Sequence, residues 1–153
     1  MLRKNAGFTL LEMLLVLLLM GTALGLVGLG GASDPAREAR QQARGVLELL
    51  HLGQRLAALE GREYGLCVAV GGVQLMNRQG QGWVKHGRGL SSAYDLHLRV
   101  EDRQQALGLA CERPQVLLSG TEADGAFSLH LQMHGRSMAH VAGDGHNVPY
   151  LHE

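Results

Sequence analysis

The sequence predicts an α+β protein in which a long N-terminal helical region is followed by antiparallel β-sheets. Three stretches with different hydrophobic patterns indicate this order. Residues 8–29 are apolar almost throughout, residues 36–60 carry apolar side chains every three or four positions, and the chain after residue 64 alternates with a period of two. Because alternating strands need one covered face, we expect the amphipathic helix 36–60 to pack on the sheets.

The apolar segment 8–29 is long enough to cross a bilayer. As a helix rising about 1.5 Å per residue it would reach roughly 33 Å, against a hydrocarbon core of about 30 Å. Arg3 and Lys4 precede it, which places the short N-terminus in the cytoplasm and sends the rest of the chain across the membrane. A cleaved secretory signal peptide is the alternative, but Ala32-Ser33-Asp34 is a poor cleavage site.

One acidic residue, Glu12, lies inside this apolar segment. A carboxylate in hydrocarbon is costly, so its presence there indicates a function. Cleavage between Gly7 and Phe8 would create a new α-amine on Phe8 and make Glu12 the fifth residue of the mature chain. In a bundle of such helices the amine of one subunit can pair with the Glu12 carboxylate of its neighbour, which would fix their axial register.

The two helical segments are separated by a Gly/Pro break at residues 30–35. Asp34 is the expected N-cap of the second helix and Pro35 its first position. Helix 36–60 is expected to end at Gly61.

Residues 61–153 are predicted to form a β-rich domain of short strands. The expected strands are 66–70, 73–76, 82–84, 96–100, 115–118 and 126–133, with one more at 136–140 that turns at 143–145. Turns are expected at 71–72, 77–80 and 123–125, and much of 80–95 and 101–114 can be loop.

Composition excludes some classes of function. The 14 basic and 14 acidic residues cancel, so no overall charge draws the chain to nucleic acid. Aromatic residues make up 4% of the chain, too few for base-stacking platforms. His130 and His134 would lie on one face of a strand about 13 Å apart. Because zinc ligands lie about 2 Å from the ion, we expect solvent-facing histidines and no metal site.

Residues 4–12, Lys-Asn-Ala-Gly-Phe-Thr-Leu-Leu-Glu, resemble the class III leader of type IV pilins and pseudopilins. The resemblance implies a leader peptide at 1–7, cleavage after Gly7 by a prepilin peptidase and N-methylation of Phe8. It also implies that Glu12 serves membrane docking and subunit alignment. The implied fold is pilin-like: a long N-terminal helix, transmembrane at first and then amphipathic, packed on antiparallel sheets. The implied location is the bacterial inner membrane, single-pass, with a cytoplasmic N-terminus and residues 61–153 in the periplasm.

The rest of the chain resembles the H-type minor pseudopilins (GspH) of type II secretion systems. Tyr64-Gly-Leu66 follows the helix, Trp83 lies in an expected hairpin, and Asp124-Gly125 leads into an apolar strand, as in that family. Leu29 stands where the major subunits usually carry proline, and we find no clustered acidic loop of their calcium-binding kind. The acid at Glu12 argues against the K-type tip subunit, which lacks it.

The resemblance implies a structural subunit, not an enzyme, that needs no cofactor and binds no nucleic acid. It would link the tip complex of the pseudopilus to its shaft and support export of folded exoproteins across the outer membrane. The implied partners are the other minor pseudopilins, the major pseudopilin, the prepilin peptidase, the inner-membrane assembly platform and the exoprotein substrates. The alternative is a minor pilin that primes type IV pilus assembly for adhesion, twitching or DNA uptake, because the leader is common to both systems.

Cys67 and Cys111 are the two cysteines of the chain, and both would lie in an oxidising compartment where one bridge can form. Cys67, however, falls in an apolar strand, where a reduced cysteine behaves as a small buried hydrophobic residue. We therefore expect no bridge, with the disulfide as the alternative.

Overall fold

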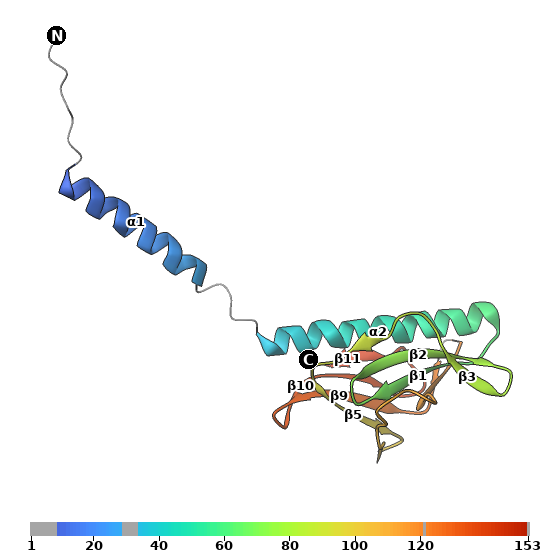
Figure 1. The fold of residues 1–153 in the computed structure, drawn as a ribbon. Coiled ribbons are helices and arrows are strands. Elements are labelled where there is room, and N and C mark those ends of the chain that lie inside the picture. The colour runs from blue at the N-terminus through green and yellow to red at the C-terminus, as the bar shows by residue number, and fades with distance from the viewer. Residues whose placement is uncertain (1–8, 29–33, 121, 153) are drawn as a thin grey trace, which may run out of the picture. The chain divides into compact units, whose positions relative to one another are not determined.

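The structure is a computed structural model, and it describes residues 9–28, 34–120 and 122–152. The chain divides into two compact units, Met1–Asp34 and Pro35–Glu153. The first unit contains helix α1 (Leu10–Gly28) and the second contains helix α2 (Pro35–Glu60) with the strands (Figure 1). The predicted α+β class is confirmed.

Helix α2 begins and ends where the local sequence directs. Pro35 is its first residue, as predicted, because proline has no N–H to lose in a first turn. At its end Gly61 adopts a left-handed backbone conformation (φ 61°) and donates its N–H to the Ala57 carbonyl at 3.0 Å. The predicted end of the helix is therefore confirmed.

The strands of the second unit form two antiparallel sheets. One sheet has the order β3-β2-β1-β7-β8, with β4 paired to β2, and the other has the order β11-β10-β9-β5-β6. The bounds are β1 (Tyr64–Ala69), β2 (Gly72–Gln79), β3 (Gly82–Lys85), β4 (Leu90–Ser91), β5 (Asp95–Val100), β6 (Arg103–Gln104), β7 (Val116–Ser119), β8 (Glu122–Asp124), β9 (Phe127–Met133), β10 (Arg136–Gly143) and β11 (Tyr150–His152).

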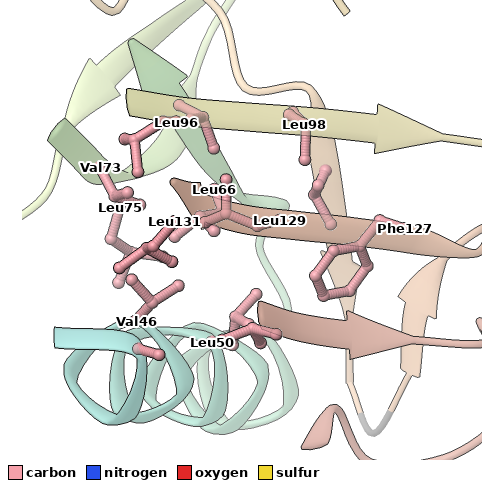
Figure 2. Packing of buried hydrophobic residues seen from close by; sticks show 14 of the residues in the cluster. Val46, Leu50, Leu66, Val73, Leu75, Leu96, Leu98, Phe127, Leu129 and Leu131 are labelled. Carbon is pink, nitrogen blue, oxygen red and sulfur yellow. The ribbon is translucent and has the colours of Figure 1, made fainter. Parts of the chain in front are cut away.

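The core lies between α2 and the inner faces of both sheets. Val46 and Leu50 point from the helix toward Leu75 and Leu131 of the strands (Figure 2). Gly53 lets the helix approach this closely, because a Cβ atom there would lie 2.5 Å from Leu118 Cδ1 and 2.7 Å from Leu75 Cδ1. The predicted packing of helix on sheets is confirmed.

Every predicted strand has a counterpart, but some details of the prediction were wrong. Residues 77–79 are the end of strand β2 and not part of a turn, because the hairpin closes in two residues at Gly80, whose φ of 59° suits a tight turn. Sequence analysis also missed β4, β6, β8 and β11. Each of these has only two or three residues, too few to display a period of two.

Candidate functional site

Helix α1 begins with a local hydrogen-bond pattern that involves Glu12. Thr9 precedes the helix, and its Oγ1 accepts the Glu12 N–H at 3.4 Å while its carbonyl accepts the same N–H at 3.0 Å. Thr9-Leu10-Leu11-Glu12 has the spacing of a capping box, with an acid at the third helical position. A carboxylate in the first turn is also favoured by the helix dipole. Glu12 is thus positioned by the helix start itself.

Apart from Glu12, the described surface of α1 from Leu10 to Met20 is apolar on all sides. From Leu10 to Met20 the large apolar side chains are 39% to 82% exposed within the chain. A helix that is apolar all round is found buried in a core or a membrane, so this surface requires cover from outside the chain. Thr22 does not interrupt it, because its hydroxyl donates to the Leu19 carbonyl at 2.9 Å.

The processing residues predicted from the sequence, Gly7 and Phe8, lie outside the described residues. Within the part of the chain that is described, no helix is long and apolar enough to cross a membrane. The predicted span 8–29 begins and ends at residues outside this part, and most of the break at 30–35 lies there too. Cleavage, methylation and the membrane span therefore stay predictions.

The two cysteines are joined, which corrects our expectation of free thiols. Cys67 and Cys111 form a disulfide, with their Cα atoms 5.8 Å apart and a sequence separation of 44. Cys67 is buried in β1, as expected. The loop that contains Cys111 runs beside β1 and is hydrogen-bonded to it. Val70 donates its N–H to the Gly108 carbonyl at 3.0 Å, and the Gln115 side chain bonds both backbone groups of Val68 at 2.9 Å. These contacts bring the second sulfur to the first.

The helix-to-strand passage singled out in the sequence is a packed junction. Tyr64 is buried, its hydroxyl donates to Glu60 Oε2 at 2.7 Å, and its ring meets His86 edge to face at 5.4 Å between centroids. Burial first, and then the hydrogen bond to Glu60, raise the pKa of Tyr64 above its ordinary value. Gly65 is needed beside it, since a Cβ there would lie 2.5 Å from Pro114 Cβ. Trp83 lies in the β2–β3 hairpin, as predicted.

The histidines predicted to face solvent are placed differently from one another. His134 lies outside β9, in the turn before β10, where its backbone has a φ of 50°. His130 and His134 therefore do not share a face of β9, because that strand ends at Met133. His130 is half-buried, and its ring stacks on that of His140. Sequence reasoning missed this contact because it depends on strand register.

A shallow pocket of about 450 Å³ lies beside the C-terminal half of α2. Sequence analysis did not single out its residues. His51 is one of them, and its Nε2 atom is buried without a hydrogen-bond partner in the described part of the chain. The pocket lining consists of His51, Gln54, Arg55, Ala58, Gly120 and Val148.

Comparison with known proteins agrees with the capped apolar helix and the fold behind it. Residues 2–28 match the family profile described as the prokaryotic N-terminal methylation motif. The fold is similar to two solved structures of the minor pseudopilin EpsH from the type 2 secretion system of Vibrio cholerae. One has a TM-score of 0.62 at 18% identity over 74% of this chain and 94% of that chain. The other has a TM-score of 0.64 at 17% identity over 78% and 98%. The fold is therefore pilin-like.

A curated relative narrows the resemblance to one type of pseudopilin. Type II secretion system protein H of Aeromonas hydrophila is 40% identical over 76 residues, which cover 49% of this chain and 42% of that protein. The matched region thus spans less than half of the relative's length. The resemblance to an H-type (GspH) minor pseudopilin, predicted from the sequence, is confirmed by the motif, this relative and the fold together.

Proposed function

We propose that the chain is a minor pseudopilin of a type II secretion system, with a structural and not an enzymatic role. It joins a short helical pseudopilus, links the tip complex to the major shaft, and supports export of folded exoproteins. The observation that carries this proposal is α1: an exposed apolar helix with a capped Thr9–Glu12 start, on a chain similar to a secretion protein H. Such a helix suits a bundle of identical or related helices.

The proposed route to the filament starts in the inner membrane. Residues 1–7 are removed by a prepilin peptidase after Gly7, and Phe8 is methylated. Residues 8–29 hold the protein in the membrane while the unit from Pro35 onward folds in the periplasm. The match of residues 2–28 to a methylation motif supports this order of events.

Glu12 is proposed to set the register of the bundle by pairing with the amine of Phe8 in an adjacent subunit. The partners are the other minor pseudopilins, the major pseudopilin and the inner-membrane assembly platform, and exoproteins meet the assembled filament. The type IV pilus alternative is less well supported, because the curated relative and both solved structures come from type II secretion systems.

A first experiment tests the processing. The protein is purified from native membranes and the mass of its N-terminal peptide is measured. We expect a start at Phe8 that carries one methyl group. An intact Met1 would leave Glu12 no new amine to meet and would contradict the proposal.

A second experiment tests the role in secretion with two matched variants in a deletion strain. Glu12→Gln keeps a side chain that can complete a capping box but removes the charge. We expect it to abolish exoprotein secretion while protein level and N-terminal processing stay normal. Glu48→Gln, at an exposed position of α2, removes the same charge elsewhere and is expected to leave secretion unchanged. Normal secretion by Glu12→Gln, or lost motility with intact secretion in the deletion strain, would contradict the proposal.

A further inference from the structure

Four histidines form a row across the outer face of the sheet β11-β10-β9-β5. The strand register places His97 opposite His130, His130 opposite His140, and His140 opposite His152. We call these four residues the histidine row. None of them neighbours another in sequence, so the antiparallel pairing alone creates it.

The row lies on the face that points away from the core. Along β9 the residues on either side of His130, Leu129 and Leu131, are fully buried in the core that α2 covers. Successive side chains of a strand point to opposite faces, so His130 faces outward. Val141 is likewise buried beside His140.

The rings of the row already lie close together. His130 and His140 stack with 4.7 Å between ring centroids and 20° between planes. His140 and His152 stack with 4.7 Å and 19°. His140 is thus the central member of two stacked pairs, and three imidazoles succeed one another across three strands.

The surroundings of the row favour neutral imidazoles. Partial burial first, and then the charges of Arg99 and His97, lower the pKa of His130 below its ordinary value. Partial burial, His130 and His152 lower the pKa of His140 in the same way. A neutral imidazole keeps one nitrogen lone pair, which is the form that binds metal ions.

The hydroxyl of Ser137 affects which ring nitrogen of His130 is available to bind a metal ion. His130 Nδ1 lies 3.4 Å from Ser137 Oγ on β10. When Nδ1 carries the proton and donates it to this hydroxyl, the lone pair is left on Nε2. Asp95 and Arg99 are the charged residues that share the outer face of β5 with His97.

We propose that the histidine row binds one divalent transition-metal ion of the zinc, copper or nickel type, held by His140 together with His130 or His152. Two nitrogens at about 2.05 Å from a tetrahedral ion lie about 3.4 Å apart. The rings now stack nearly parallel with centroids 4.7 Å apart, so their in-plane lone pairs do not converge. Metal binding therefore requires both rings to turn out of the stack about their side-chain torsions. The strands need not move.

The donor type and number define what the site accepts. Imidazole suits zinc, copper and nickel, whereas calcium and magnesium prefer oxygen ligands. Within the described residues no group of three or more His, Cys, Asp or Glu side chains is arranged to hold a metal ion. The site is therefore a two-histidine one whose remaining coordination positions are filled by water, and it is independent of the proposed role in secretion.

The test measures binding of zinc to the full chain in detergent, purified with a tag that contains no histidine. Calorimetry is carried out with Zn²⁺ and, for comparison, with Ca²⁺. We expect one Zn²⁺ per chain and no binding of Ca²⁺. His140→Asn, which breaks both stacked pairs, should weaken Zn²⁺ binding by about tenfold or more. His134→Asn removes an exposed histidine from the adjoining turn and should leave the affinity unchanged.

A second measurement on the unaltered protein keeps the test independent of how the variants fold. Diethyl pyrocarbonate modifies accessible histidines, and peptide masses show which ones react. We expect Zn²⁺ to protect His140 together with His130 or His152, but not His134. Absence of Zn²⁺ binding, equal loss of affinity in the two variants, or protection of His134 instead of the row would overturn the proposal.

Discussion

Removal of the disulfide is expected to destabilise the C-terminal unit strongly. The bridge closes a loop of 44 residues, from β1 to the loop that contains Cys111. In the chain-entropy description, a bridge over a loop of this length contributes about 4 kcal/mol by restricting the unfolded chain. A domain of this size has a net stability of roughly 5 to 15 kcal/mol, so the loss is a large share of the total.

The loop does not depend on the bridge alone, which limits the damage to the folded state. The bond from Val70 to Gly108 and the two bonds between Gln115 and Val68 remain when the sulfurs are replaced. Cys67→Ala also leaves only a small gap in β1. We therefore expect Cys67→Ala/Cys111→Ala to fold, with a melting temperature lower by about 15 °C.

The assay is equilibrium unfolding of the full chain in mild detergent, followed by circular dichroism with and without a reducing agent. The double variant should unfold at a lower denaturant concentration than the oxidised unaltered protein, and the reducing agent should not change its unfolding midpoint. When reduced, the unaltered protein should have the same unfolding midpoint as the variant. When oxidised, its midpoint should lie at a much higher denaturant concentration. If the oxidised protein, the reduced protein and the double variant all unfold together, the bridge contributes nothing and the reasoning is wrong.

Three further outcomes follow from the packing and the charges of the second unit. Gly53→Ala should destabilise the second unit by about 1 to 3 kcal/mol, because the new Cβ meets two buried leucines. Gly45→Ala should be near neutral or stabilising, because its Cβ would meet only the end of Leu90 at 3.1 Å. Thermal melts of the two variants measure the difference. Leu131→Ala, at a fully buried position, should cost about 2 to 5 kcal/mol, and Leu109→Ala, at a position 92% exposed, should change stability little; equal effects would contradict the assigned core. Asn147→Ala should raise the pKa of Asp144, which the Asn147 side chain and the backbone N–H groups of His146 and Asn147 now lower to about 2. Because this pKa is depressed on folding, the contribution of the carboxylate is present above pH 3.8 and is lost as the pH falls toward about 2, and an NMR titration of the Asp144 carboxyl in both proteins measures the change.

Those features that depend on neighbours in sequence were predictable. The start of α2 at Pro35 and its end before Gly61 rest on local backbone chemistry, which a single sequence displays. The main strands were found for the same reason, since β9 alternates buried and half-buried residues along its length. The resemblance of the first thirty residues rests on a contiguous motif, and the matched profile covers that same segment.

Contacts between distant residues were not predictable in this way. The bridge from Cys67 to Cys111 depends on a loop that is hydrogen-bonded to β1. The residues that make these hydrogen bonds form no recognisable sequence pattern. The histidine row depends on the register of four strands, and a shift of one residue in any pairing would turn a histidine to the other face. A single sequence contains the residues of both features but not the pairing that assembles them.

Glu12 shows how the two kinds of information combine. From the sequence, its carboxylate was a cost in an apolar segment that only a partner amine could offset. The structure adds a local contribution, because the Glu12 N–H is satisfied by Thr9 and the carboxylate lies in the helix's first turn, where the dipole favours negative charge. The helix start therefore offsets part of the cost of the acid in the single chain, by about 0.3 to 1 kcal/mol. On the route proposed above, the subunit would reside in the membrane before assembly, and an amine from the next subunit would then add specificity of register.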